Sequence, residues 1–393
     1  MGQTELKLSE QDLRHWKLLD EFREALDRAS GREQPPPGWR APARKLQYSQ
    51  YLSLFLFGLF NPALRTMRAL CNASQWKRVQ REVCGGAVSL GSFSEAQHLV
   101  ELSALDRVFG DLSAQVQEPA PKDPRLGWRQ WFARDSSLFA ALPHMAWALY
   151  GGGRAGAPNR AVRLHLNLHL LSDTPARAHI TQGRYCERKS WEGQWEAQAG
   201  YVGDRYFGKN YQVFGRLEQK GCAYVIRLIE EATVTIEQEL PLTEADRRAN
   251  VVRQAWVRLG KEQFRSVRVR LVWIEGKDCS LMLVTNLAPE ALSAELVAML
   301  YRRRWQIECF FRWVKCLLGC RHWLAESPQG VSLQLYLALI AAVLLHLCLG
   351  RRPNKRMLEL LQLHQMGWAT TEELIAGIQR EQQRENRRKK TGR

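Results

Sequence analysis

The amino-acid sequence predicts a mixed α/β fold in which a helical N-terminal region precedes a mixed sheet, and a β-rich insertion interrupts that sheet. Three observations support this prediction. Residues 46–116 read as helical throughout, and the segments after residue 127 alternate apolar and polar side chains with the period of two that is typical of strands. A long helix pattern then begins near Ser293.

The N-terminal region is predicted to consist of helices. The proline-rich segment 32–45 separates a short first helix from the helices that follow. A helix is expected to stop at Asn61-Pro62, and Ser92 with Glu95 forms the pattern of a capping box that would start another helix. A DNA-reading helix-turn-helix domain and a plain helical bundle fit this pattern equally well.

Three strands are expected after a linker at residues 117–127. The first is WRQWFARDSSLF. The second is AVRLHLNLHLL, in which the leucines face one way and the polar-face residues His165, Asn167 and His169 face the other. The third is ARAHITQG, which pairs with the second through the turn SDTP.

A strand–helix–strand unit is predicted next. The strand AGYVGDRYF ends at Asp204, the helix KNYQVFGRLEQKG follows, and the next strand is AYVIRL. A β-rich insertion then separates this unit from the strand SLMLVTNL and the long helix. An antiparallel trio followed by a strand–helix unit fits a mixed α/β sheet of the RNase H kind, and other mixed sheets fit the pattern as well.

The composition points to an anionic partner. The 393 residues include 57 Lys and Arg against 40 Asp and Glu, which gives a formal net charge of +17. Such an excess is typical of proteins that bind nucleic acid or an acidic membrane surface. The length predicts two or three domains, and the apolar share of 45% is enough for sizeable cores.

A membrane partner is disfavoured. The most apolar stretch, Leu333 to Gly350, is slightly short for a bilayer span and contains Gln334 and His346, so a buried helix is expected there. The N-terminus has no apolar run of the signal-peptide kind. Nine cysteines at irregular spacing predict reduced thiols in the cytoplasm. Nucleic acid is therefore the predicted partner.

The helix sequence YRRRWQIECFFRWVK surrounds one acid, Glu308, with five basic side chains. At 100° per residue, Tyr301, Arg304, Glu308 and Lys315 fall within an arc of roughly 60° on one face. Such a face suits a carboxylate that holds a metal ion among cations that hold phosphates. The alternative is a lattice of intrahelical ion pairs, from Arg304 to Glu308 and on to Arg312, each worth about 0.3–0.5 kcal/mol.

Hard divalent ions need several oxygen ligands, so further acids are expected near Glu308. Asp204 stands at the end of an apolar strand, where a charged residue needs a reason, although a turn-forming role is equally open. Asp135 lies within the first strand. Asp173 competes with it, but its place before Thr-Pro suits a hairpin turn. The predicted metal ligands are therefore Asp135, Asp204 and Glu308.

The spacing of Tyr301, Arg304, Glu308 and Lys315 resembles the Tyr-Arg-Glu-Lys signature of insertion-sequence-four type DDE transposases, which are encoded by bacterial insertion sequences. The segments DSSLFAALP and VGDRYFGKNYQVFGRLEQKGCAYVIRL are similar to the two aspartate segments of that family. The resemblance covers roughly residues 45–350, and the β-rich stretch before the helix looks like the insertion of the same family.

This resemblance implies cut-and-paste DNA transposition on an RNase H-like core. Asp135, Asp204 and Glu308 would hold two Mg²⁺ ions, with Mn²⁺ as an alternative, in the general two-metal arrangement. The phosphate ligands would be Tyr301, Arg304 and Lys315. The resemblance also implies double-stranded DNA as partner (the element ends and the target), a homodimer in the synaptic complex, and a place with the bacterial nucleoid in the cytoplasm.

Trp305 matches an aromatic residue that in this family can stack on a base near the cleavage site. Packing of Trp305 against the insertion is the alternative. Some family members also have a tryptophan in the strand before the helix that holds a flipped base, but Leu281 stands there in this chain. Trp256 or Trp273 could substitute from the insertion.

On this basis the sequence is predicted to have five segments: a helical DNA-binding domain (1–125), a first core part (126–220), a β-rich insertion (221–279), a second core part (280–350) and a basic tail (351–393). Arg268, Arg270 and the tail RENRRKKTGR are predicted non-specific DNA contacts, with solvated surface as the alternative. Two rival functions remain: a metal-dependent nuclease without strand transfer, and a non-catalytic DNA-binding protein derived from a transposase.

Overall fold

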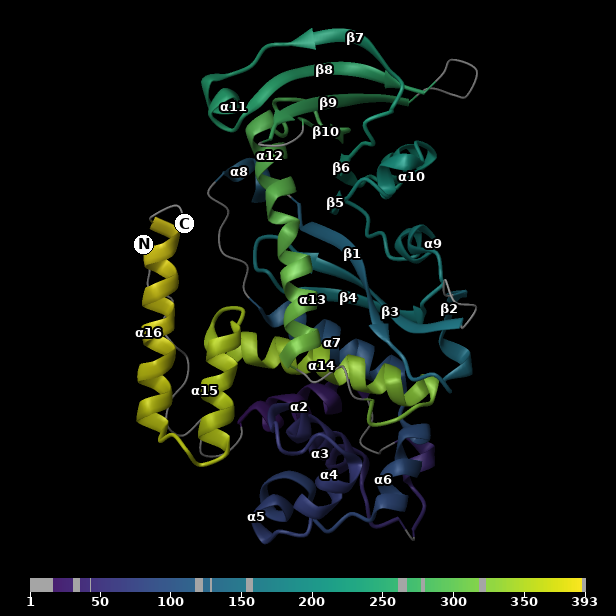
Figure 1. Cartoon of the computed structure of the whole chain (residues 1–393), viewed down its shortest axis with the longest axis vertical. Helices are drawn as coiled ribbons and strands as arrows, with labels where there is room; N and C mark the ends of the chain where they lie inside the picture. Colours follow the sequence, from purple (N-terminus) through teal and green to yellow (C-terminus); the bar gives the residue numbers. More distant parts are fainter. Residues whose placement is uncertain are drawn as a thin grey trace. The chain divides into compact units, whose positions relative to one another are not determined.

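The computed structural model describes most of the chain (Figure 1). The described ranges are 17–30, 36–42, 44–116, 123–127, 129–152, 158–260, 267–276, 280–317 and 323–390. These residues form two compact units, each described separately below. The first unit comprises Met1–Gln117, Leu138–Val162 and Phe311–Arg393, and the second comprises Glu118–Ser137 and Arg163–Phe310. The five segments predicted from the sequence remain predictions.

The first unit is mainly helical, as the sequence predicts for residues 46–116. Its helices before the sheet are α2 (Lys17–Ser30), α3 (Tyr48–Phe60), α4 (Met67–Ala73), α5 (Lys77–Val79), α6 (Leu90–Ala96) and α7 (Leu102–Gln115). Helix α3 ends where expected, at Asn61-Pro62. The predicted capping box is wrong, because α6 begins earlier. Ser89 is its N-cap and accepts a hydrogen bond from the backbone N–H of Ser92 (3.2 Å).

The most apolar stretch of the sequence forms α14 (Pro328–Leu349), which packs against α2, α3 and α7. Within the described ranges, α14 is the one helix long and apolar enough to cross a membrane, and 83% of its most apolar window is buried. The expectation of a buried helix is therefore confirmed. Helices α15 (Lys355–Gln365) and α16 (Thr371–Lys390) complete the unit, and α16 contains most of the basic tail in helical form.

Among the residues that the structure describes, the sheet has ten strands in the order β2-β3-β1-β5-β6-β10-β9-β8-β7, with β4 paired to β3. Their bounds are β1 Trp131–Ala140, β2 Leu149–Gly152, β3 Pro158–His169, β4 Pro175–Gln182, β5 Gly200–Gly203, β6 Ala223–Arg227, β7 Val234–Leu240, β8 Val251–Leu259, β9 Val267–Glu275 and β10 Ser280–Thr285. The strands β1, β5 and β6 run parallel to one another. From β6 onward each neighbouring pair is antiparallel: β6 with β10, β10 with β9, β9 with β8 and β8 with β7. The β-rich segment thus extends the same sheet (Figure 1).

Between β3 and β4 the chain turns at Asp173, which has a positive φ of 57°. Aspartate tolerates this left-handed conformation better than most residues do. The backbone N–H of His169 donates to the carbonyl of Thr174 (2.8 Å), which closes the turn. The prediction that Asp173 is a turn residue is therefore confirmed.

Alternation along the parallel strands decides which side chains meet. Phe132 and Tyr201 stack at 5.8 Å between ring centroids on one face, in the apolar cluster that includes α9 (Glu187–Glu192) and α10 (Gln212–Gln219). Because successive side chains of a strand point to opposite faces, Ala133, which follows Phe132, and Val202, which follows Tyr201, belong to the other face. Ala133 and Asp135 therefore share a face with Val202.

The parallel register of β1 and β5 depends on a close contact between Trp131 and Gly200, which are direct partners. A methyl group on Gly200 would lie 2.5 Å from the fully buried Trp131 indole. We expect Gly200→Ala to lower the free energy of unfolding by about 1–3 kcal/mol through overpacking, measured by urea unfolding. In the matched control Gly215→Ala, on α10, no atom lies within 4 Å of the new methyl group, and a gain of about 0.5–1 kcal/mol is expected. Equal effects of the two changes would contradict this account of the register.

Candidate active site

Asp135 and Asp204 lie at corresponding positions on neighbouring parallel strands. The register pairs Trp131 with Gly200 and Ala133 with Val202. Two residues further along each strand are Asp135 and, immediately after β5, Asp204. Adjacent strands lie about 4.8 Å apart, and positions two residues on share a face. The fold therefore brings these two acids together just beyond the β1–β5 ladder, where β5 ends and β1 continues to Ala140.

The carboxylate of Asp135 is in an electrostatically costly position. Its side chain is only 21% exposed. Burial, together with the charge of Asp204, raises the pKa of Asp135 to about 7, although the Ser136 N–H (2.8 Å) and Arg304 oppose the rise. A site with two neighbouring carboxylates, one of them largely buried, favours a bound cation.

The third acid is presented by a helix that follows β10. Ser293 caps α12 (Ala294–Arg303) by accepting a hydrogen bond from the backbone N–H of Leu296 (3.3 Å). The regular helix is interrupted at Arg304, whose backbone angles stay helical (φ −50°, ψ −35°), and continues as α13 (Trp305–Leu317), with Glu308 in its first turn. The start near Ser293 is as predicted, but the single long helix is wrong, because α12 ends one residue before Arg304.

Arg304 links the helix acid to the strand acid. Its Nη2 donates to Oε1 of Glu308 (2.6 Å), and its Nη1 lies 3.7 Å from Oδ2 of Asp135. The Arg304 side chain is 13% exposed, and its guanidinium also lies over the ring of Tyr301, 5.7 Å from the centroid. The predicted Arg304–Glu308 ion pair is thus present, and the same guanidinium reaches Asp135.

The carboxylate set has the chemistry of a divalent-metal site, but its side chains are not arranged around one ion. Within the described ranges, no group of three or more His, Cys, Asp or Glu residues could hold a metal as the side chains stand. Arg304 lies between Asp135 and Glu308 and supplies the positive charge that a metal would bring. Carboxylate oxygens are the ligands that Mg²⁺ prefers. The chemical type of these donor atoms therefore suits such an ion, whereas their present arrangement places Arg304 among them.

Two other predicted residues have separate surroundings. The Trp305 side chain is 50% exposed, which agrees with a role in contact with a partner better than with packing against the insertion. Lys315 belongs to the first unit, where its ammonium lies 5.1 Å from the ring centroid of Phe139.

The sequence analysis missed a buried polar network on the opposite face of β1. Arg134 is 1% exposed, and burial lowers its pKa to about 9. Its guanidinium donates to Asn167 Oδ1 (3.1 Å), to Ser190 Oγ (3.0 Å) on α9 and to Gln194. His165 and Asn167 are fully buried, because α9 covers this face. An arginine within the apolar run WFAR was the signal for this network.

A second set of contacts lies next to Asp135. Glu187, at the start of α9, accepts hydrogen bonds from the Ser136 hydroxyl and from Nη1 of Arg163. Arg163 Nη1 also donates to the Ser136 hydroxyl (2.9 Å). These contacts tie the residue that follows Asp135 to α9 and β3.

The predicted DNA contact Arg270 is wrong. Its side chain is fully buried, and it donates to the backbone carbonyl of Leu292 and to Gln254 (3.4 Å). Arg268 is exposed, but it pairs with Glu237 (2.8 Å) and its guanidinium lies over Trp256. The alternation of Val and Arg in β9 therefore does not produce a free basic surface.

The comparisons with known proteins were consistent with one another. Residues 130–344 match the transposase DDE domain family. The chain is similar to a probable transposase of insertion sequence element IS5377 from Geobacillus stearothermophilus, with 32% identity over 206 residues, which is 51% of this chain and 52% of that protein. It is also similar to the proposed transposase y4zB of Sinorhizobium fredii, with 25% identity over 61% of this chain and 65% of that protein.

A third relative is a proposed transposase of insertion sequence element IS4SA from Synechocystis sp.. The identity is 22% over 306 residues, which is 76% of this chain and 81% of that protein. The matches thus span about half of the first relative's length and under two thirds of the second's.

Proposed function

The chain belongs to the transposases with a DDE domain, and from this membership we propose that it cuts the ends of an insertion sequence and joins them to target DNA. The observation that carries the proposal is the meeting of Asp135 with Asp204, together with the bridge of Arg304 from Asp135 to Glu308. A role in DNA binding alone gives no reason for two acids on one largely buried guanidinium with a third acid close to one of them. The spacing of Tyr301, Arg304, Glu308 and Lys315 supports the insertion-sequence-four type.

DDE transposase domains generally use divalent metal ions, and Asp135, Asp204 and Glu308 would hold them here. The ion is Mg²⁺, with Mn²⁺ as an alternative. When bound, such ions activate the attacking oxygen and stabilise the leaving oxygen in phosphoryl transfer. The raised pKa of Asp135 gives this side chain a strong preference for a nearby cation.

Arg304 has two roles in this proposal. In the structure its guanidinium pairs with Glu308 and lies near Asp135. Were those carboxylates to hold divalent ions instead, the fork of Arg304 would be available to bind a DNA phosphate through two hydrogen bonds. Tyr301 donates its hydroxyl, Lys315 supplies a further positive charge, and the exposed Trp305 stacks on a base.

The sheet order supports an RNase H-like core. Across the sheet, β3, which pairs with β4, lies beside β1, and the parallel strands β5 and β6 come next on the other side of β1. Residues 1–125, predicted from the sequence as a helical domain, bind DNA. Double-stranded DNA, both element ends and target, is the partner, and two copies of the chain form the synaptic complex. The protein acts in the bacterial cytoplasm on nucleoid DNA.

Strand joining tests this function against a nuclease. Purified protein is incubated with Mg²⁺, a linear DNA carrying the sequences that flank its own gene, and a supercoiled target plasmid. We expect a product in which the flanking ends are covalently joined to the plasmid, detected by gel electrophoresis and sequencing of the junctions. Cleaved DNA without joined product would instead identify a metal-dependent nuclease, and no processing at all would contradict both readings.

A further inference from the structure

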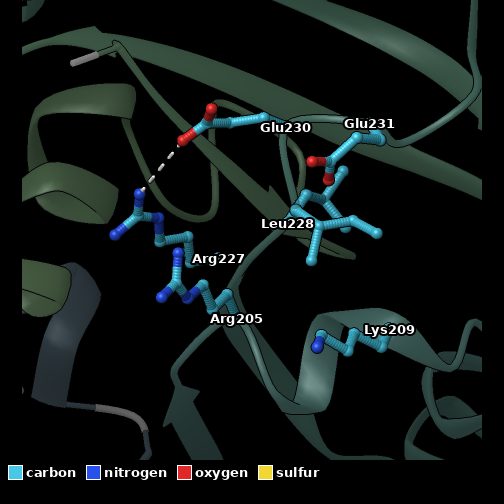
Figure 2. Close-up of a pocket in the computed structure, with 7 residues that line it drawn as sticks. Arg205, Lys209, Arg227, Leu228, Glu230 and Glu231 are labelled. Atoms are coloured by element: carbon cyan, nitrogen blue, oxygen red, sulfur yellow. Dashed lines mark ion pairs between the residues drawn. The ribbon is translucent and has the colours of Figure 1, made fainter.

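A cavity of about 310 Å³ lies beside the carboxyl ends of β5 and β6. This volume is in the range of small-ligand sites. Figure 2 shows basic side chains on one side of the cavity and acidic side chains on the other. The residues that matter here are Arg205, Lys209, Arg227, Leu228, Glu230 and Glu231.

The cavity is built by a tight turn that begins at Asp204. Oδ1 of Asp204 accepts a hydrogen bond from the backbone N–H of Tyr206 (2.9 Å), and the 3-10 turn η5 (Phe207–Lys209) follows. Phe207 is buried, and a methyl group on Gly208 would overlap the carbonyl oxygen of Arg227. The turn therefore packs directly against the end of β6. This packing holds in place the backbone that carries Arg205 and Lys209.

The charges in this cavity are incompletely compensated. Arg227 pairs with Glu230 at 3.9 Å, and the Glu230 side chain is 69% exposed, so the pair is weak. Neither Arg205 nor Lys209 has an ion-pair partner among the residues that the structure describes. Figure 2 shows the Arg205 and Arg227 guanidinium groups lying close together, with the Lys209 ammonium directed towards the same space. Three cations thus share the cavity with two exposed acids, Glu230 and Glu231, and form one weak ion pair with them, which leaves excess positive charge for an anion.

The position of the cavity identifies the anion. Arg205 is the neighbour of Asp204, and Arg227 ends the next parallel strand. In open α/β sheets, ligands bind outside the carboxyl ends of the strands. A DNA strand whose scissile phosphate lies at Asp135 and Asp204 would carry its neighbouring phosphates across the end of β6. We propose that Arg205, Lys209 and Arg227 bind a backbone phosphate of that strand, and that Glu230 competes with it for Arg227. This inference rests on the proposed function.

The test is the salt dependence of DNA binding, measured by fluorescence anisotropy with a labelled duplex of arbitrary sequence and the full-length protein. Each of Arg205→Gln, Lys209→Gln and Arg227→Gln is expected to reduce the slope of log K against log[salt] by about 1. In contrast, Glu230→Gln should tighten binding by about two- to five-fold at low salt, because Arg227 loses its internal partner.

A double variant and a matched control sharpen the test. If Glu230 acts through Arg227, the variant Arg227→Gln/Glu230→Gln binds like Arg227→Gln alone. Arg216→Gln is the control, since Arg216, on α10, pairs with Glu192 of α9 at 2.9 Å and does not line the cavity. Its salt slope should match that of the unmodified protein.

The outcomes separate this inference from the function on which it rests. Unchanged slopes in the three cavity variants of a protein that binds DNA would overturn the inference and leave the proposed function intact. Absence of any DNA binding by the unmodified protein would overturn the proposed function. Inorganic phosphate at constant ionic strength should not displace the duplex, and displacement by millimolar phosphate that is lost in Arg227→Gln would instead identify a site for free phosphate.

Discussion

Replacement of Asp204 by asparagine is expected to lower the rate of DNA cleavage by about 10³-fold or more, while DNA binding is retained. Removal of a single group that stabilises the charge of a transition state typically lowers the rate by about 10²–10³-fold, and loss of a metal-binding carboxylate is expected to cost at least as much. Asp204 comes two residues after Val202, the register partner of Ala133, and its charge acts on Asp135. Asparagine keeps the hydrogen bond to the Tyr206 N–H but loses the charge that holds a divalent ion. Cleavage is measured with Mg²⁺ and with Mn²⁺ on the same end-containing DNA.

Asp173→Asn is the matched control, because it removes one carboxylate from the turn between β3 and β4. Asn adopts the positive φ of this position as readily as Asp does. We therefore expect normal folding and normal cleavage. If Asp204→Asn cleaved DNA as fast as this control, the assignment of Asp204 to the catalytic site would be wrong.

The second large effect concerns Asp135 and pH. Its pKa is raised by burial from the ordinary value of 3.8 to about 7 in the folded protein. Between these two pH values the folded chain binds a proton that the unfolded chain has released, so rising pH destabilises the fold. Without added metal, this residue should lower the free energy of unfolding by roughly 2–4 kcal/mol between pH 4 and pH 8.

The measurement compares urea unfolding of the unmodified protein and Asp135→Asn in EDTA from pH 4 to pH 8. The difference between the two proteins isolates this one group from other titrations. We expect the variant to gain stability relative to the unmodified protein as pH rises, and Mg²⁺ to reduce that gain at pH 8. A difference that is constant with pH would show that Asp135 does not titrate in this window.

The sequence correctly indicates most of the elements that carry the acids. Apolar runs bounded by turn residues predict β1, β3, β4, β5 and β6, and Ser293 marks the start of the helix. Two local predictions fail for local reasons. A serine three residues earlier caps α6, and the regular helix is interrupted at Arg304, which divides the expected long helix.

The burial of charged side chains such as Arg134 and Arg270 could not be predicted from the sequence pattern. Alternation in β9 assigns Arg270 to one face, but it cannot say that this face is covered and that Leu292 offers its carbonyl. The same holds for Arg134, whose amide and hydroxyl partners come from β3 and from residues 190–194. An uncompensated guanidinium is tolerated in the interior only when such partners are present, and these come from distant parts of the chain.

The sequence by itself determined which acids and cations this protein has, on which strand or helix each lies, and which neighbours share its face, because side-chain direction follows from the period of the local structure. Only the tertiary structure decided that Asp135 and Asp204 lie near each other beyond the β1–β5 ladder and that Arg304 lies between Asp135 and Glu308. Strand register depends on packing between residues far apart in the chain, such as Trp131 against Gly200. Arg304 forms its ion pairs with the carboxylates that this packing places within reach, which are those of Asp135 and Glu308.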